Sequence, residues 1–257
     1  MKNLVHEHER IDDLQINNLK IIQNPEGFCF GIDAVLLANF VKLKKNAKVA
    51  DLGTGTAIIP ILLAGKSKTS HFTALEIQKD IADMAERSIK LNRLENRIKI
   101  LSIDLKDAEK FLEVNKYDVV TSNPPYMHSK GLINADDKKA ISKHEVKCTL
   151  EDVIKTASRL LRHNGRFFMV HRPIRLTDIM FYCRQYKLEP KYLQFIHPTY
   201  NKKPNLLLLE CVKSAKPELK ILDPLYVYNG EGEYTDDIFR IYGKTCIKEE
   251  DEFCEYD

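Results

Sequence analysis

The residues best suited to chemistry are Asn123-Pro124-Pro125-Tyr126, which directly follow the β-branched run Tyr117–Ser122. An aromatic amine is a poor nucleophile because its nitrogen lone pair is delocalised into the ring. The Asn123 side-chain oxygen and the Pro124 carbonyl can accept both N–H protons and so direct the lone pair at a methyl group. The prolines stiffen the turn, and the Tyr126 ring offers a face on which a flipped base can stack. We therefore predict methyl transfer to an aromatic amine. Asn123, Pro124 and Tyr126 are the predicted catalytic residues, and Pro125 and Tyr126 are predicted to contact the substrate. The alternative is a turn with a purely structural role.

A glycine-rich segment predicts a cofactor site. Residues 51–57 (DLGTGTA) lie between a predicted strand and a predicted helix. There Gly53 and Gly55 let the backbone pass close to a ligand that the helix N-terminus faces. Glu76 ends the next predicted strand, where a carboxylate can accept both ribose hydroxyls of a nucleotide-like cofactor. The alternatives are a turn that serves packing and a surface acid.

The same segment favours S-adenosylmethionine over a dinucleotide. A dinucleotide site requires a third small residue, but Ile58 stands there and Pro60 follows in the first helical turn. S-adenosylmethionine has no phosphate and needs an acid near its amino group, which Asp51 can supply. Asp104, at the end of the third predicted strand, can accept from the adenine amino group. The predicted cofactor is S-adenosylmethionine, held by Asp51, Gly53, Gly55, Glu76, Asp104 and Asn123.

These residues are brought together if the chain forms a parallel sheet. Short β-branched runs alternate with amphipathic stretches of helical length, which is typical of a parallel α/β sheet. Strands are predicted at 48–52, 71–76, 97–102, 117–122, 163–171, 189–197 and 205–212. Helices are predicted at 58–64, 78–91, 149–161 and 174–186. The third of these begins with a capping box formed by Thr149 and Asp152. The last two strands flank a short turn, so we expect this end of the sheet to be antiparallel.

Composition and charge exclude some classes of protein. The 257 residues are 44% hydrophobic and 30% charged, as in ordinary globular proteins. No apolar run approaches the roughly 20 residues of a membrane-spanning helix, so we expect a cytoplasmic protein without membrane contact. The six cysteines are scattered without a C-x-x-C pair, so we expect no metal site. Residues 249–257 hold six acids, so the rest of the chain has nine more basic than acidic residues, an excess that suits nucleic acid.

Several of these motifs together resemble a known family. Residues 51–64 (DLGTGTAIIPILLA), 74–78 (ALEIQ), 122–126 (SNPPY) and 165–176 (GRFFMVHRPIRL) look like class I amino methyltransferases with an NPPY signature. Residues 24–37 and 224–235 (PLYVYNGEGEYT) are similar to segments of the tRNA-valine adenine N6-methyltransferase family. The likeness runs from about Arg10 to Gly243.

The resemblance implies methyl transfer from S-adenosylmethionine to N6 of adenine at position 37 of a valine tRNA. We expect a monomer, since nothing in the sequence requires an oligomer. The resemblance also implies the same cofactor and target-amine residues that the motifs suggest. Two departures stand out. Ala57 replaces the glycine usual at the third position of GTGTG, and Lys143-His144-Glu145 stands where Arg-His-Glu is expected, which loses a bidentate contact.

The implied fold is α/β: a Rossmann-like class I methyltransferase sheet, mostly parallel, with an antiparallel C-terminal strand pair and a short N-terminal hairpin-helix extension. Residues 1–45 are predicted to form the extension, with a hairpin that turns at Asn24–Gly27 and a helix over 31–41. Residues 46–245 are the predicted methyltransferase domain, and residues 246–257 a disordered acidic tail.

Basic residues after three predicted strands can form one rim around the site, because open α/β sheets bind ligands at the carboxyl ends of their strands. They are Lys138, Lys139, Lys143, His171, Arg172, Lys202 and Lys203. We assign substrate contact to Lys143, Arg172, Lys202 and Lys203, with tRNA as the partner. Solvated lysines, and a His171 that only caps a strand, are the alternatives.

Three other functions remain open. The NPPY turn can also present a side-chain amide, so glutamine N5-methylation of a protein such as a release factor is the main alternative; enzymes of that kind usually carry a helical N-terminal domain. Adenine methylation in DNA would need a target-recognition domain. A non-catalytic methyltransferase-like RNA-binding protein would not need the complete set of acid, glycines and NPPY.

Overall fold

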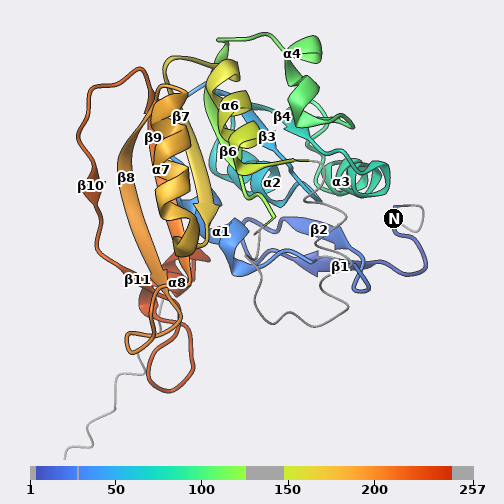
Figure 1. Cartoon of the computed structure of the whole chain (residues 1–257). Helices are drawn as coiled ribbons and strands as arrows, with labels where there is room; N and C mark the ends of the chain where they lie inside the picture. The colour runs from blue at the N-terminus through green and yellow to red at the C-terminus, as the bar shows by residue number, and fades with distance from the viewer. Residues whose placement is uncertain (1–3, 28, 126–147, 245–257) are drawn as a thin grey trace, which may run out of the picture.

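A single large sheet organises the molecule. The computed structural model describes residues 4–27, 29–125 and 148–244, and its strands follow the order β10-β8-β9-β7-β6-β3-β4-β5, with β11 beside β8 (Figure 1). The strands are β3 (Lys48–Leu52), β4 (His71–Leu75), β5 (Ile98–Leu101), β6 (Tyr117–Ser122), β7 (Leu161–His171), β8 (Leu188–His197), β9 (Leu206–Lys213), β10 (Lys220–Ile221) and β11 (Leu225–Tyr226). Strand β9 runs antiparallel to β7 and β8, and the other pairs are parallel. The predicted fold class is confirmed.

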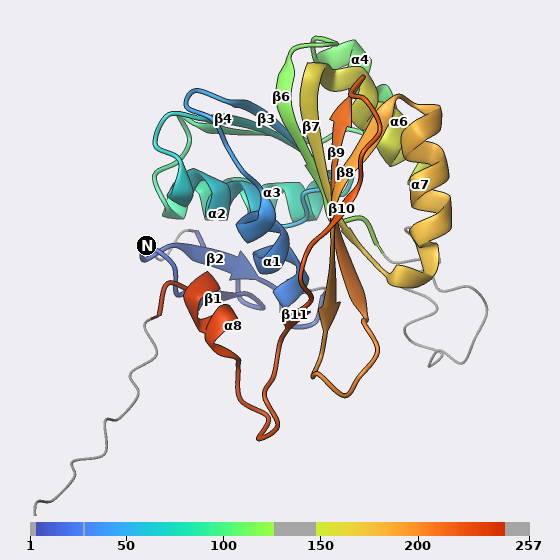
Figure 2. The same ribbon diagram turned by 90° about the vertical axis from the view of Figure 1, so that its left-hand side faces the viewer.

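Helices cover both faces of this sheet (Figure 2). One face carries α1 (Ile32–Phe40), α2 (Ile58–Lys66) and α3 (Lys79–Leu91), and the other carries α6 (Leu150–Leu160) and α7 (Leu176–Gln185). Shorter helical segments are η1 (Leu105–Asp107), α4 (Ala108–Phe111), η2 (Pro173–Arg175) and α8 (Asp236–Ile241). Among the described residues no helix has the length and apolar character needed to span a membrane.

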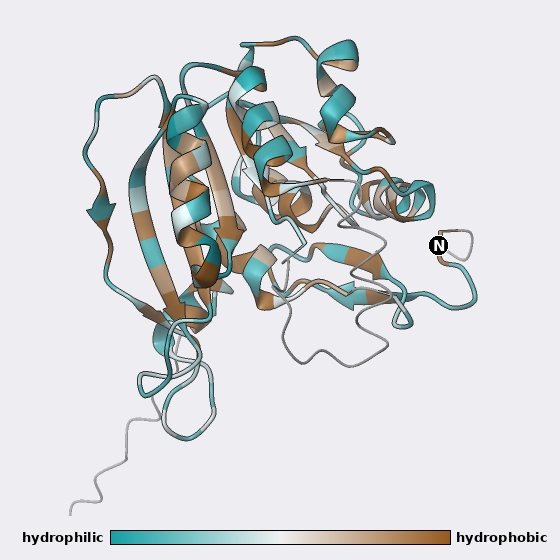
Figure 3. Cartoon of the chain, viewed as in Figure 1, coloured by the Kyte–Doolittle hydropathy of each residue, from teal (hydrophilic) through white to brown (hydrophobic). Residues whose placement is uncertain are grey.

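Two hydrophobic cores lie on either side of the sheet, because successive strand residues point to opposite faces. In β3, Val49 packs into the core under α1 to α3, whereas Ala50 and Leu52 pack into the core under α6 and α7. Strands covered on both faces are mostly apolar, and much of the length of the inner strands is coloured hydrophobic in Figure 3. Helix α6 begins as predicted, since the Thr149 hydroxyl accepts from Asp152 N at 3.2 Å and Asp152 Oδ2 accepts from Thr149 N at 3.0 Å.

The N-terminal hairpin differs from the prediction. It pairs β1 (Arg10–Asp13) with β2 (Lys20–Gln23) and turns between Leu14 and Leu19, so the prediction of a turn at Asn24–Gly27 was wrong. Within the true turn Gln15, Asn17 and Asn18 have φ values of 55°, 52° and 57°, a region that asparagine tolerates better than most residues. Asn24–Gly27 forms a separate turn, closed by a Gly27 N to Asn24 O bond of 3.0 Å, that leads the chain toward α1. The helix predicted over 31–41 is present as α1.

Three smaller differences concern strand ends. Strand β7 begins at Leu161, ahead of the predicted His163. Strands β10 and β11 were missed, because two residues each leave no periodicity to read. Strand β5 ends at Leu101, one residue before the predicted end at Ser102, and Asp104, which follows the strand end as predicted, caps η1. The predicted acidic tail and the loop that carries Lys138, Lys139 and Lys143 lie outside the described residues.

A buried ion pair attaches the N-terminal segment to α3. Arg87 Nη1 and Nη2 donate to the two carboxylate oxygens of Glu9 at 2.5 and 2.7 Å, and Arg87 Nη1 also donates to the Leu4 carbonyl at 2.7 Å. The side chains of Arg87 and Glu9 are only 8% and 7% exposed. The bidentate geometry offsets the cost of burying both charges.

Replacing Arg87 by methionine should therefore lower the free energy of unfolding by about 3 kcal/mol, because it leaves the Glu9 carboxylate buried without its partner. Chemical denaturation at pH 7 measures the change. The control is Arg10→Met, which removes an Asp12 ion pair whose arginine is 56% exposed and should change the stability far less than Arg87→Met does. Equal effects of the two substitutions would contradict this account of the ion pair.

Candidate active site

The candidate site lies where the order of the sheet changes direction. From β3 the chain goes first to β4 and β5 on one side and later to β6 and β7 on the other. Open α/β sheets bind ligands at this position, outside the carboxyl ends of the strands. The segments after β3, β4 and β6 meet there, and they carry Asp51–Ala57, Glu76 and Asn123–Pro125 respectively.

Asp51 is a buried carboxylate at this edge, 2% exposed. Its Oδ1 accepts from the Thr121 hydroxyl at 2.5 Å, across the β3–β6 pair. Within the described residues neither Asp51 Oδ2 nor the neighbouring buried Thr54 hydroxyl has a hydrogen-bond partner. Burial raises the pKa of Asp51 to about 6, although the Thr121 hydrogen bond opposes the rise. Buried polar atoms without partners are costly, so this pair is suited to a polar, cationic ligand group.

The loop between β3 and α2 leaves room for that ligand. Gly53 and Gly55 have φ values of 70° and 57°, and a Cβ built on either would meet no atom within 4 Å. Ala57, which caps α2, has a φ of 67° and is fully buried. A glycine would adopt this conformation with less strain, which gives a physical reason for the glycine usual at that position in the family. The backbone here forms an open cradle in which Ala57 still fits.

Glu76 follows β4 and faces the same loop. Its Oε2 accepts from Gly55 N at 3.0 Å and its Oε1 accepts from Gln78 N at 3.0 Å. Gln78 Nε2 also donates to Oε1, at 3.3 Å, so the side chain is held beside the glycine loop, and Oε2 keeps a lone pair for a further donor such as a ribose hydroxyl. The carboxylates and glycines fit the ammonium and ribose groups of S-adenosylmethionine.

Asp104 follows β5 and is the N-cap residue of η1. Its side chain accepts from Lys106 N at 3.0 Å and forms an ion pair with Lys106 Nζ at 3.4 Å. These contacts fix the start of η1, so Asp104 has a structural role in addition to the predicted contact with the adenine ring, which stays a prediction.

Asn123, Pro124 and Pro125 directly follow the end of β6, with Pro124 buried and Pro125 exposed. Pro124 and Pro125 line a small cavity of about 20 Å³ together with His171 and Arg175. His171 accepts at Nδ1 from Arg172 N at 2.8 Å, and burial next to Arg175 lowers its pKa to about 4. The imidazole is therefore neutral at physiological pH, with its proton on Nε2. The fourth residue of the motif, Tyr126, lies outside the described residues.

The basic residues assigned to substrate lie along the same edge but farther from β3. Arg172 follows β7, and its Nη1 donates to the Asn205 carbonyl at 3.2 Å. Lys202 and Lys203 are exposed in the loop between β8 and β9. Lys143, like Lys138 and Lys139, falls outside the described residues, so a continuous rim stays a prediction.

Two site residues were missed from the sequence: Thr54 and Thr121. Thr121 is a polar residue within the apolar run of β6, and that anomaly was the available signal. Its pairing with Asp51 depends on the register of β6 against β3, which the sequence alone does not provide.

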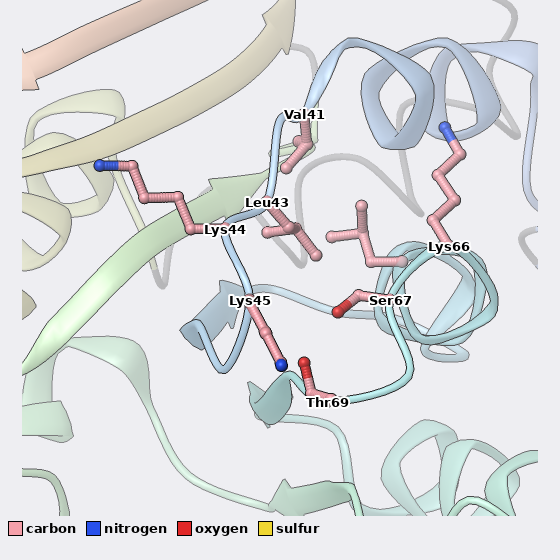
Figure 4. Close-up of a pocket in the computed structure, with 8 residues that line it drawn as sticks. Val41, Leu43, Lys44, Lys45, Lys66, Ser67 and Thr69 are labelled. Carbon is pink, nitrogen blue, oxygen red and sulfur yellow. The ribbon is translucent and has the colours of Figure 1, made fainter.

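A larger cavity, of about 400 Å³, lies at the opposite edge of the sheet, beside the segments that precede β3 and β4. Figure 4 shows that Lys44 and Lys66 point away from it, and that Lys45 points toward Thr69. Lys66 Nζ instead donates to the Ala38 carbonyl at 2.9 Å. This cavity is separate from the candidate active site.

Comparison with known proteins agrees with the site. The fold and the cradle define a class I methyltransferase that depends on S-adenosylmethionine. Residues 19–180, more than half of the chain, match the family model described as methyltransferase small domain, and the chain belongs to this family.

Relatives and solved structures extend the comparison. Proteins named tRNA1(Val) (adenine(37)-N6)-methyltransferase are similar to this chain. The one from Pedobacter heparinus is 28% identical, and the match covers 79% of this chain and 85% of its own length. The one from Flavobacteriaceae bacterium strain 3519-10 is 23% identical, and the match covers 91% of this chain and 95% of its own length. A crystal structure of a predicted O-methyltransferase from Agrobacterium tumefaciens has a TM-score of 0.68 and 24% identity, covering 82% of this chain and 95% of its own. A geranyl diphosphate C-methyltransferase from Streptomyces coelicolor A3(2) has a TM-score of 0.55 and 11% identity, covering 70% and 78%. Their different acceptor atoms indicate that these likenesses concern the fold alone.

Asp51→Asn should make the protein more stable at pH 8 and weaken S-adenosylmethionine binding. A carboxyl whose pKa is raised from 3.8 to about 6 in the folded protein costs stability once it ionises, and this cost is absent below pH 4 and complete above pH 6. The gain at pH 8 should be about 1–3 kcal/mol, shrinking to nothing at pH 4.

Thermal unfolding and calorimetric titration with S-adenosylmethionine at both pH values measure the two effects. Asp223→Asn, at an exposed position, is the control and should change neither quantity. If Asp51→Asn left both stability and cofactor affinity unchanged at pH 8, Asp51 would not be a buried carboxylate that costs stability and binds the cofactor.

Proposed function

We propose that this enzyme transfers a methyl group from S-adenosylmethionine to the exocyclic N6 of an adenine in tRNA, at position 37 of a valine tRNA. The observation that carries the proposal is the position of Asn123-Pro124-Pro125 at the end of β6, directly beside the strand that bears Asp51. The names of the similar proteins from Pedobacter heparinus and Flavobacteriaceae support the adenine and its position. A tRNA substrate implies a cytoplasmic location, and one chain provides the proposed site.

We assign the cofactor to the cradle between β3 and β4. Bound S-adenosylmethionine supplies a methyl group attached to a positively charged sulfur. The Asp51 carboxylate and Thr54 hydroxyl bind its ammonium group, and the backbone at Gly53 and Gly55 lies along it. Glu76 accepts from the ribose hydroxyls, and Asp104 accepts from the adenine amino group.

We assign the target amine to the β6 turn. The Asn123 side-chain oxygen and the Pro124 carbonyl each accept a hydrogen bond from one N–H group of N6, which turns the nitrogen lone pair toward the methyl group. Ring closure at both prolines restricts the backbone, so little conformational entropy is lost when the base binds. Pro125 and Tyr126 pack against the base, and the positive charges of Lys143, Arg172, Lys202 and Lys203 bind the RNA backbone.

Asn123→Ala should lower kcat for tRNA methylation by about 100-fold to 1,000-fold, the usual effect of removing one preorganised hydrogen-bonding group. Its dissociation constant for S-adenosylmethionine should stay within about tenfold of the wild-type value, which is the control for folding. The measurement is transfer from radiolabelled S-adenosylmethionine to total tRNA that lacks N6-methyladenine, followed by identification of the modified nucleoside.

N6-methyladenine produced by the wild type and not by Asn123→Ala supports the proposal. Intact cofactor binding without any labelling of tRNA would contradict it. In that case glutamine side chains of release factors become the acceptor to test, because the Asn-Pro-Pro turn can present an amide in the same way.

A further inference from the structure

The loop that joins β8 to β9 projects from the carboxyl edge of the sheet (Figures 1 and 2). It spans residues 198–205 and carries Tyr200, Lys202 and Lys203, all exposed. The Tyr200 side chain is 67% exposed, and among the described residues no aromatic ring packs against it. An exposed aromatic ring next to two cations has the composition of a surface that stacks a base and binds phosphate.

The loop is held by hydrogen bonds at several points. Lys202 N donates to the Thr199 carbonyl at 3.0 Å, and the Lys202 carbonyl lies 2.7 Å from His197 Nδ1. The neighbouring segment after β11 supports it, since Tyr228 N donates to the Pro198 carbonyl at 2.8 Å. The His197 ring also lies 5.3 Å from the Tyr226 ring. Tyr200 is thus carried on a preorganised turn, which lowers the entropy lost on binding.

Strand order connects this loop to the candidate active site. From β6 the sheet continues through β7 and β9 to β8, so the β8–β9 loop begins about 10–15 Å from the end of β6 at the usual strand spacing. The Arg172 guanidinium lies between the two, bonded to the Asn205 carbonyl at 3.2 Å. Asn123, Arg172 and Lys202 therefore follow one another along a single edge.

We propose that Tyr200, Lys202 and Lys203 form a platform for single-stranded RNA, on which a nucleotide near the target adenine stacks while the lysines bind its phosphates. This inference rests on the proposed function and adds a contact between the enzyme and an unpaired nucleotide near the target adenine. Bases in a duplex are stacked and closed to a side chain such as Tyr200, whereas unpaired loop bases are not. The adjoining turn carries Glu231 and Glu233, both exposed, so the RNA backbone runs on the lysine side.

The test compares steady-state methylation of an unmodified tRNA transcript by four variants. Tyr200→Ala should raise KM for RNA by about 5-fold to 150-fold, the range for loss of one base–aromatic stack, without a change in the dissociation constant for S-adenosylmethionine. Tyr200→Phe, which keeps the ring, should restore most of the affinity. The double variant Lys202→Ala/Lys203→Ala should reduce the slope of log affinity against log salt by about 1.4, or 0.7 for each phosphate contact. Phe181→Ala, at an exposed aromatic 63% accessible on α7, is the matched control and should behave like the wild type.

Equal KM values for Tyr200→Ala, Phe181→Ala and the wild type would overturn the platform and leave the proposed function standing. A wild-type enzyme that binds S-adenosylmethionine but methylates no RNA would overturn both. Faster methylation of an adenine within a fully paired duplex than within a loop would also overturn the platform, even if Tyr200→Ala raised KM.

Discussion

A buried carboxylate at the end of the central strand is the constraint on which the rest of the site depends. Asp51 is almost fully excluded from solvent, and Thr121 satisfies only one of its oxygens. Folding alone would favour a neutral residue there, so the carboxylate costs stability that a bound cation can recover. Proteins retain such strained polar groups where a ligand needs them.

The surrounding elements follow from that position. Strand β3 lies between β4 and β6, so the segments that follow these three strands converge at one edge. Glu76 is fixed there by backbone N–H groups of Gly55 and Gln78, and the loop between β3 and α2 stays open because its glycines adopt positive φ values. On the other side, the neutral His171 and Pro124 pack around one small cavity. The same sheet therefore places the cradle and the Asn-Pro-Pro turn next to each other, as the proposed transfer between methyl donor and acceptor requires.

Much of the fold and of the candidate site could be predicted from local sequence patterns. The central strands and their helices show the hydrophobic patterns typical of a parallel α/β sheet, and Thr149 and Asp152 predicted the capping box of α6. Features that depend on pairing between distant segments could not be predicted from the sequence. The pairing of β2 with β1 requires a turn between Leu14 and Leu19 whose residues have positive φ values. The Thr121–Asp51 contact requires the register of β6 against β3. Strands β10 and β11 are too short to show a pattern. The cap that Asp104 forms on η1 was not predicted, because a single turn of three residues shows no helical periodicity.

The most direct test of the central claim is a crystal structure of the protein with S-adenosylhomocysteine. We expect the ligand over Gly53 and Gly55, with its ammonium group near Asp51 and its ribose hydroxyls on Glu76. Ligand bound at another part of the surface, or a complex in which neither carboxylate contacts it, would contradict the account.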